Sequence, residues 1–244
     1  MTNGIADRPG RAGWRYLMGV MLLSLLPCGP AGARLPEYDE PIRAVYLIRH
    51  GEYDQDDERD PDVGRGLVGL GFAQARLVAD RLEAMGVTFT SLQASTMTRA
   101  RETGEVIATR FPGLALDLHR DIRECTPTTR RLDIMEREDP LEVAACEDSL
   151  AVAWGRIFAP AGDVDAHDIV VCHGNVIRWF VTRALAVDTE AWLGMSIANC
   201  SLTVIQVKRD GSCKLVAFAD AGHIPPRMQT YPGTTAENAD SPDW

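Results

Sequence analysis

The sequence lacks an excess of basic residues, which argues against a protein that binds nucleic acid. It has 25 Lys and Arg against 35 Asp and Glu in 244 residues, so the formal net charge is −10. A protein that binds nucleic acid needs a basic face to neutralise the phosphates. An acidic protein can still bind a small anion where its surface is locally basic. We therefore expect no nucleic-acid partner, but the composition does not exclude an anionic substrate.

Regular repeats are missing as well. The chain has no Gly-X-Y period, no sustained heptad and no internal repeat, which excludes collagen-like, coiled-coil and repeat architectures. With 45% hydrophobic and 25% charged residues, it has the composition of a globular protein and not of a disordered one. The length allows one domain with a full core, or at most two small ones.

Paired cysteine motifs are also missing. The chain has six cysteines but no C-x-x-C spacing, so a structural zinc site is not expected. Five cysteines remain if the first 33 residues are removed, and an odd number cannot all pair within one chain. Cys172 lies in an apolar run and has the surroundings of a buried small residue. A disulfide is permitted in an oxidising compartment, but the sequence does not demand one.

The N-terminus has no apolar run of the roughly 20 residues that a transmembrane helix needs. Three arginines precede an apolar stretch over residues 16–26, which prolines and a glycine end, and Ala31-Gly32-Ala33 follows. This order is typical of a secretory signal peptide with cleavage after Ala33, or of a retained signal anchor. We therefore expect residues 1–33 to lie outside the fold. The protein would be exported, as a periplasmic or secreted protein, or attached to a membrane through this segment.

The rest of the chain alternates between apolar strand patterns and helical patterns. This alternation predicts an α/β fold, a three-layer α/β/α sandwich with a mostly parallel central sheet. Asp210-Gly211 lies between two alternating runs and predicts a hairpin. The expected strands are 44–48, 88–92, 114–118, 168–172, 201–207 and 213–218, and the expected helices are 70–85, 97–110, 139–158 and 176–185.

Two histidines follow predicted strands, and each has a glycine after it that suggests a tight turn. They lie in Arg49-His50-Gly51 and in His173-Gly174-Asn175. Ligands of open α/β sheets bind beyond the carboxyl ends of the strands. A single histidine there is most simply a structural loop residue. Two such pairs in one chain instead indicate a functional site.

A third motif runs from Ser95 to Thr103 and predicts a helix with a Ser or Thr cap and Arg99 in its first turn. Free N–H groups at a helix start favour anions, and an arginine adds a forked donor. Arg123-Glu124 follows the strand predicted at 114–118 and alone is an ordinary charge pair. The remaining histidines are read as structural or surface residues: His119, His167 and His223.

Taken in their order along the chain, the four motifs resemble those of the histidine phosphatase superfamily, whose members are phosphoglycerate-mutase-like. Within it the sequence is similar to the mitochondrial phosphoglycerate-mutase-like Ser/Thr protein phosphatases, as in the run from Val171 to Arg178. We expect a histidine phosphatase domain over residues 34–226 and a partly ordered tail over 227–244. One departure is Val68, which stands where the family has a threonine and cannot cap a helix through a hydroxyl.

The resemblance implies a phosphomonoester hydrolase, acting on a phosphorylated small molecule or on phosphoserine and phosphothreonine in proteins. His50 would attack phosphorus and form a phosphohistidine. The phosphate would be bound by Arg49, Arg99, His173, which carries a positive charge if protonated, and Asn175. Glu124 would carry the leaving-group proton, which makes His50, Glu124 and His173 the catalytic set. No metal and no other cofactor is expected, because protein cations neutralise the phosphate.

Two alternatives stay open. The first is a phosphoglycerate-mutase-like phosphotransferase, which an exported location disfavours. The second is a non-catalytic phosphate-binding or scaffold protein on the same fold. Against the second, the sequence keeps every member of the expected set. A homo-oligomer is also left open.

Overall fold

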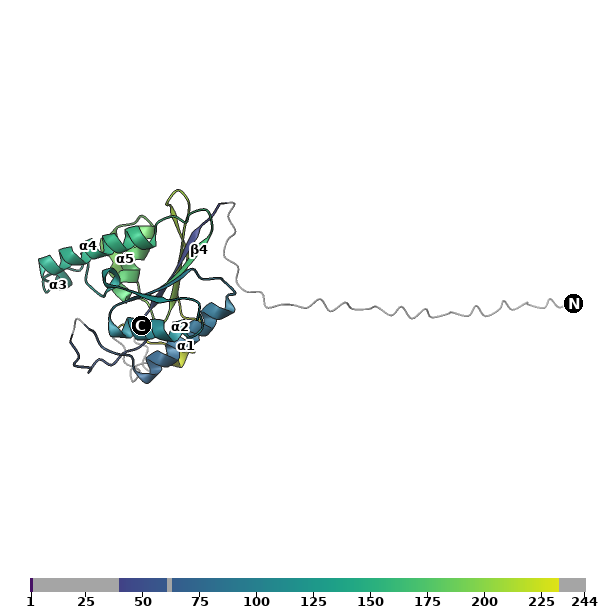
Figure 1. Ribbon diagram of the computed structural model, residues 1–244, viewed down its shortest axis with the longest axis horizontal. Coiled ribbons are helices and arrows are strands. Elements are labelled where there is room, and N and C mark those ends of the chain that lie inside the picture. Colours follow the sequence, from purple (N-terminus) through teal and green to yellow (C-terminus); the bar gives the residue numbers. More distant parts are fainter. Residues whose placement is uncertain (2–39, 61–62, 233–244) are drawn as a thin grey trace. The chain divides into compact units, whose positions relative to one another are not determined.

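The computed structural model describes residues 1, 40–60 and 63–232 (Figure 1). Apart from Met1, the expected signal segment over residues 1–33 lies outside the described residues, and so do residues 233–244 of the expected tail. Within the described part of the chain, no helix combines the length and apolar character needed to cross a membrane.

One six-stranded sheet in the order β3-β2-β4-β1-β5-β6 forms the centre of the fold. The four strands from β3 to β1 are parallel, β5 runs antiparallel to β1, and β6 pairs antiparallel with β5. The sheet is therefore mostly parallel, as predicted. The strands are β1 (Arg43–Arg49), β2 (Ser91–Ser95), β3 (Leu116–His119), β4 (Ala166–Cys172), β5 (Leu202–Val207) and β6 (Cys213–Asp220).

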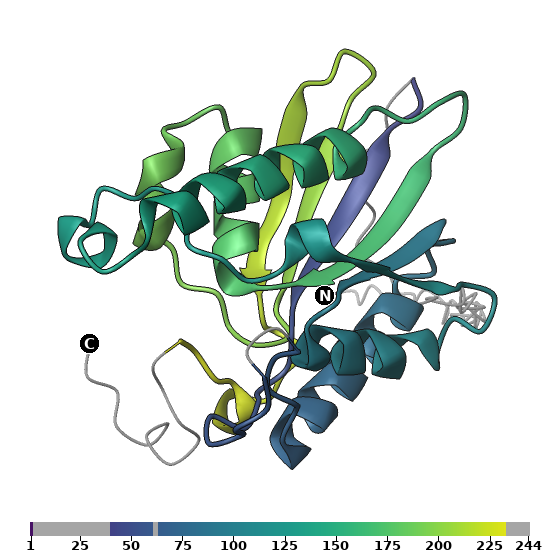
Figure 2. The same ribbon diagram turned by 60° about the vertical axis from the view of Figure 1, so that its left-hand side comes forward.

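Helices cover both faces of the sheet, which confirms the three-layer sandwich (Figure 2). Tyr46 and Ile48 of β1 pack on the side of α1 and α2, whereas Val45 and Leu47 pack on the side of α4 and α5. A strand buried on both faces needs apolar residues at every position, as the run at 44–48 has. The helices are α1 (Gly69–Ala84), α2 (Thr98–Ala108), α3 (Leu132–Met135), α4 (Pro140–Ile157) and α5 (Gly174–Ala184), with 3₁₀ helices η1 (Arg120–Ile122), η2 (Thr189–Gly194) and η3 (Pro226–Met228).

The helix starts correct one prediction and confirm another. The residue before α1 is Val68, and its side chain caps nothing, as expected. The predicted Ser or Thr cap of α2 is wrong, because the residue before α2 is Met97, which makes no side-chain cap. The nearby Thr98 hydroxyl instead donates to the carbonyl of Val63, at 3.0 Å, so it ties α2 to a loop.

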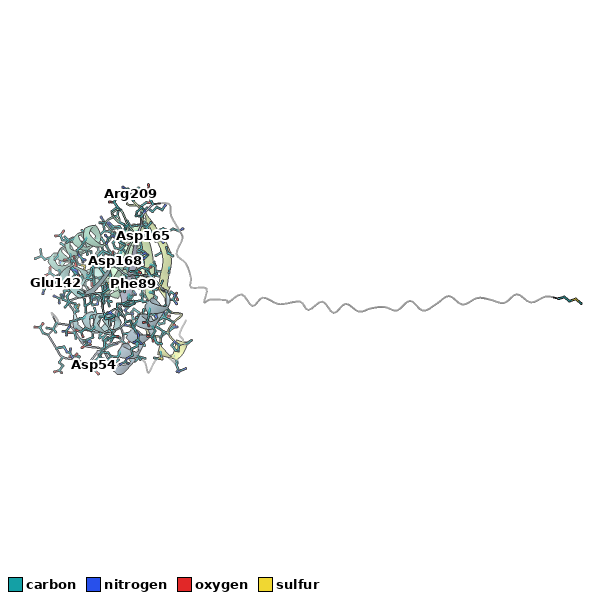
Figure 3. All side chains as sticks on the ribbon, turned by 45° about the vertical axis from the view of Figure 1, so that its right-hand side comes forward. Asp54, Phe89, Glu142, Asp165, Asp168 and Arg209 are labelled. Carbon is teal, nitrogen blue, oxygen red and sulfur yellow. A yellow bond between two sulfur atoms is a disulfide. The ribbon has the colours of Figure 1, made fainter. Side chains whose placement is uncertain are left out.

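Polar residues fasten the end of the sheet where β1 and β4 begin. Asp165 accepts a hydrogen bond from the Ile42 N–H at 2.8 Å, and the buried Asp168 forms an ion pair with Arg43. Figure 3 labels Asp165 and Asp168 near this end and Asp54, which follows β1, at the opposite end. This polar cluster therefore lies at the end where β1 and β4 begin, and not at the carboxyl ends of the parallel strands.

The chain after residue 226 is still bound to the body of the fold. Thr230 is buried, and its hydroxyl donates to Asn199 Oδ1 at 3.1 Å. Gln74 on α1 donates to the carbonyl of Met228 at 2.7 Å. The described part of the expected tail thus packs against α1 and the loop before β5.

Cys125 and Cys146 form a disulfide, a pairing that the sequence left open. The other cysteines in the described part of the chain are free: Cys172, Cys200 and Cys213. Cys172 is fully buried on β4, as expected.

Candidate active site

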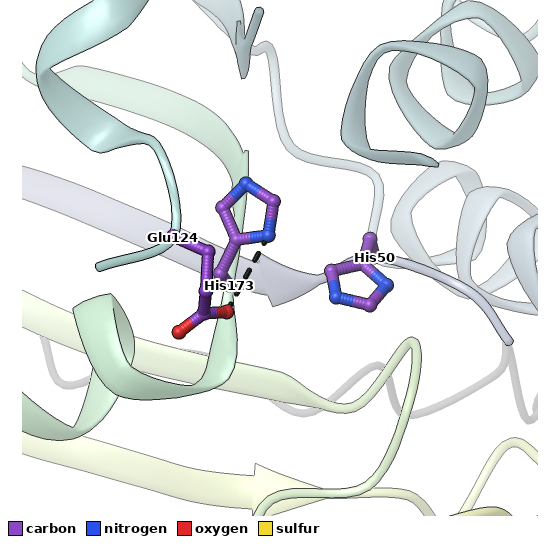
Figure 4. Close-up of side chains that lie close together, drawn as sticks. All are labelled: His50, Glu124 and His173. Carbon is purple, nitrogen blue, oxygen red and sulfur yellow. Dashed lines mark ion pairs between the residues drawn. The ribbon is translucent and has the colours of Figure 1, made fainter. Parts of the chain in front are cut away.

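The two strand-end histidines lie side by side because β1 and β4 are adjacent and parallel. Arg49 pairs in register with Cys172, so the next residues along each strand are His50 and His173. The His50 N–H donates to the carbonyl of Cys172 at 3.0 Å, and the two imidazole centroids are 5.1 Å apart. Both rings are buried. Figure 4 shows them with Glu124, which approaches His173 from a separate segment.

The hydrogen bonds of His50 identify its tautomer. Its Nδ1 lies 2.8 Å from the carbonyl of Gly51, and a carbonyl only accepts, so Nδ1 carries the proton. Nε2 then holds the lone pair and accepts a hydrogen bond from Arg99 Nε at 3.1 Å. Burial lowers the pKa of His50 well below its usual value, and the charges of Arg99 and Arg49 lower it further. The neutral ring is therefore favoured, and its Nε2 keeps the lone pair that a nucleophile needs.

Position 51 requires glycine because another chain segment passes close to it. The predicted tight turn does not explain this glycine. A Cβ added there would lie 2.6 Å from the carbonyl oxygen of Gly71 on α1, which no side chain tolerates. Gly174 is likewise no turn residue, because it is the first residue of α5. The absence of a side chain at Gly51 thus allows α1 to pack directly against the site.

Two buried arginines flank His50. Arg99 lies in the first turn of α2, and its guanidinium stacks over the Tyr53 ring, 4.9 Å from its centroid. Arg49 donates through one terminal nitrogen to the carbonyl of Ile197 at 2.7 Å, while its Nε has no hydrogen-bond partner. Burial lowers the pKa of both guanidinium groups, but from so high a value that both stay charged. The surroundings of His50 therefore favour an anion.

His173 directly precedes α5, and Ser95 contacts its ring. The sequence analysis considered Ser95 only as a helix cap. Nε2 of His173 lies 2.9 Å from Ser95 Oγ. Its Nδ1 makes no hydrogen bond and lies 3.5 Å from Glu124 Oε2. Burial lowers the pKa of His173 well below its usual value, and nearby arginines lower it further. These shifts favour the neutral form of His173 when no anion is bound, and its role in binding phosphate stays a prediction.

Glu124 lies just after η1, in a segment without helix or strand. Its Oε1 accepts a hydrogen bond from the N–H of Asn175 at 3.2 Å. Burial raises the pKa of its carboxyl group, although the charges of Arg99 and Arg49 oppose the shift. A carboxyl group with a raised pKa next to two histidines is suited to donating and accepting a proton.

Asn175 is brought to the site, but its side chain is engaged with protein groups. Its Nδ2 donates to the carbonyl of Cys125 at 3.1 Å, and its Oδ1 accepts from Arg178 at 3.3 Å. A phosphate-binding role for Asn175 stays a prediction. Arg178 is a buried cation near Glu124 that the sequence analysis missed. Its position in the apolar α5, between Ile177 and Trp179, could have revealed it, because a charge there needs a polar partner.

The site has the ligand types for a metal ion but the wrong electrostatics. One nitrogen from each of His50 and His173 and one oxygen of Glu124 lie within 4.8 Å of one another. Histidine and glutamate are both metal ligands. The buried Arg49 and Arg99 next to them repel a divalent cation and attract an anion. The donor set therefore does not fit a resident metal.

Curated relatives of known name match most of this chain. It is 37% identical over 204 residues to the protein of Caenorhabditis elegans called serine/threonine-protein phosphatase Pgam5, mitochondrial, covering 78% of this chain and 66% of that protein. It is 34% identical over 189 residues to the human protein of the same name, covering 75% of this chain and 64% of that protein. The chain thus spans about two thirds of the length of these relatives.

These relatives correct the expected location. Both are named as mitochondrial proteins, so the prediction of an exported protein with a secretory signal peptide is wrong. The prediction failed because an N-terminal segment with several arginines, few acidic residues and an apolar stretch is shared by more than one kind of targeting sequence.

A solved structure has a similar fold, and a family model matches the part of the chain that contains the site residues. The phosphoglycerate mutase of Plasmodium falciparum has the same fold, with a TM-score of 0.55, 26% identity, and coverage of 76% of this chain and 96% of that one. The model of the histidine phosphatase superfamily (branch 1) matches residues 45–149 and 159–221, which include both histidines and Glu124. The chain therefore belongs to the histidine phosphatase superfamily, as its four motifs predicted.

Proposed function

We propose that this protein is a phosphomonoester hydrolase that acts through a phosphohistidine on His50, with phosphoserine and phosphothreonine in proteins as its substrates. The observation that carries the proposal is the neutral His50, whose Nε2 lone pair accepts a hydrogen bond from Arg99. The names of the relatives support the protein substrates. A pocket of about 450 Å³ at Arg99 and a groove of about 760 Å³ at Glu124 leave room for a peptide segment.

Five of the expected residues have a defined task in this reaction: His50, Arg49, Arg99, His173 and Glu124. The incoming phosphate takes over the hydrogen bond of Arg99, which frees His50 Nε2 to attack phosphorus in line with the leaving oxygen. Arg49 and Arg99 donate to the non-bridging oxygens, where negative charge persists in the transition state. The unpartnered Nδ1 of His173 faces the same site and adds a donor. Glu124 protonates the leaving oxygen and then accepts a proton from the water that cleaves the phosphohistidine.

The experiment is a turnover assay of the full chain with nitrophenyl phosphate and with phosphoserine and phosphothreonine peptides. We expect inorganic phosphate from all three, at rates that EDTA does not change, because cationic side chains replace a metal. Absence of phosphate release from every substrate would support a non-catalytic phosphate-binding protein. Transfer of the phosphoryl group to a sugar-acid acceptor in preference to water would instead indicate a mutase.

Replacing Arg99 with lysine is expected to lower kcat/KM clearly, although the positive charge is kept. Lysine lacks the planar fork that contacts His50 and the phosphate oxygens together. We expect a loss of about 2–4 kcal/mol in transition-state stabilisation, comparable to the loss of one preorganised donor. Steady-state kinetics with nitrophenyl phosphate measure this loss.

The matched control is Arg101→Lys on the same helix. The Arg101 side chain is 42% exposed and pairs with Glu105, so this variant should keep the wild-type kcat/KM. If Arg99→Lys also keeps it, Arg99 has no role in binding the transferred phosphoryl group.

A further inference from the structure

The Cys125–Cys146 disulfide joins the residue next to Glu124 to a helix that is fixed in the core. Cys125 directly follows Glu124 in the chain, and its Cα is 5.7 Å from that of Cys146. Cys146 lies on the buried face of α4, together with Leu150 and Ala153. The disulfide therefore fixes the segment that carries Glu124 to α4.

Contacts from two directions hold this segment. On the side of α5, Asn175 donates its N–H to Glu124 Oε1 and its side-chain amide to the carbonyl of Cys125. On the side of α4, the disulfide holds Cys125, and Glu147 accepts a hydrogen bond from the Thr128 N–H at 3.2 Å. The segment from Arg123 has no helix or strand of its own, so these contacts, together with the buried Ile122 that precedes it in η1, hold Glu124 in place.

We propose that the Cys125–Cys146 disulfide is a positioning element for Glu124, so that its reduction weakens proton transfer to the leaving group while nucleophilic attack by His50 continues. This inference rests on the proposed function. The hydrogen bonds of His50 join it to Gly51, Arg99, Cys172, Asn199 and Cys200, and none of these residues lies in the segment of Cys125 or on α4. A displacement of about 1 Å at a catalytic group can cost about 100-fold in rate.

A dithiol reagent can reach the bridge from solvent. Both cysteines line the groove of about 760 Å³ that also contains Glu124, and Cys125 is the more exposed of the two. One thiolate of the reagent attacks Cys125 Sγ, the S–S bond breaks, and Cys146 leaves as a thiolate that takes up a proton. The second thiol of the reagent then displaces Cys125 as a thiol. Two electrons pass to the protein, and the reagent leaves as its own disulfide.

The experiment compares oxidised protein with protein reduced by dithiothreitol, in a Cys213→Ser background. Among the described residues, this background removes the half-buried free cysteine, and the other two free cysteines, Cys172 and Cys200, are fully buried. Thiol titration confirms the release of two thiols. We expect kcat/KM for a phosphoserine peptide to fall about tenfold or more on reduction, and kcat/KM for nitrophenyl phosphate to stay within about twofold, because nitrophenolate leaves without a proton.

The double variant Cys125→Ser/Cys146→Ser in the same background provides a second measurement. It should show the selective loss of the reduced protein and should not respond to dithiothreitol. If this variant fails to fold, the reduced protein alone decides. Equal values of kcat/KM for the peptide before and after reduction overturn the inference, and so does an equal fall on both substrates, which indicates a general loss of structure. If the oxidised protein hydrolyses neither substrate, the proposed function is contradicted and this inference falls with it.

Discussion

Replacing His50 with alanine is expected to abolish turnover and to leave no acid-labile phosphoryl group on the protein. Alanine removes the imidazole nitrogen that Arg99 contacts, so position 50 can no longer attack phosphorus. Loss of an enzyme nucleophile typically lowers kcat by about 10⁴-fold or more. Acid quenching of a reaction with labelled substrate, followed by isolation of the protein, measures the phosphohistidine directly.

A histidine outside the site provides the control for this variant. His119 ends β3, and we read it as a structural residue, so His119→Ala should keep both turnover and labelling. A phosphoryl label that persists in His50→Ala would move the nucleophile to another residue, and His173 would be the first to test. Thermal unfolding of both variants shows whether the fold is preserved.

The expected positions of the two histidines could be derived from the sequence because they depend on local patterns. The continuous apolar runs that became β1 and β4 indicate strands buried on both faces, and such strands lie at the centre of a parallel sheet. Residues that follow these strands meet at one edge. The structure brings His50 and His173 to this edge, 5.1 Å apart between ring centroids.

Contacts between distant segments could not be predicted in the same way. Ser95 lies beside His173 only because β2 and β4 pair, and the hydroxyl gives no local sign of a histidine partner. The reason for Gly51 is the approach of Gly71 on α1, so the expected turn was the wrong explanation. The Cys125–Cys146 pairing depends on how α4 packs, and an odd number of cysteines leaves many pairings possible.

Helix and strand limits also differed where tertiary contacts override local preference. The second strand was expected over 88–92 but runs from Ser91 to Ser95, and Thr90 before it bonds to the carbonyl of His167 through both its hydroxyl and its N–H. The residues after α5 were left unassigned and form η2, where Trp192 is buried and donates to the carbonyl of Thr128.

The replacement of Glu124 with glutamine is expected to have an effect that depends on the leaving group. An alkoxide leaving from phosphoserine needs a proton, which glutamine cannot supply, whereas nitrophenolate needs little help. General acid catalysis is worth about 10²–10⁴-fold, so kcat/KM for an alkyl phosphate should fall within that range and kcat/KM for nitrophenyl phosphate should change little. Glutamine keeps the acceptor for the Asn175 N–H, so the segment stays in place. Glu83→Gln is the matched control, because its exposed carboxylate on α1 lines neither the pocket at Arg99 nor the groove at Glu124.

The same variant tests the second task of Glu124, activation of the water that cleaves the phosphohistidine. With nitrophenyl phosphate, the glutamine variant should release a burst of nitrophenolate close to one equivalent per site, followed by slow turnover with phosphate retained on His50. In the wild type, burial raises the pKa of Glu124, so the carboxyl group keeps its proton to higher pH than usual. Activity on alkyl phosphates should therefore decline as pH rises through that pKa, and this decline should be absent in the variant. Equal losses on both substrates, with neither burst nor label, would mean that Glu124 only shapes the site and that another residue carries the proton.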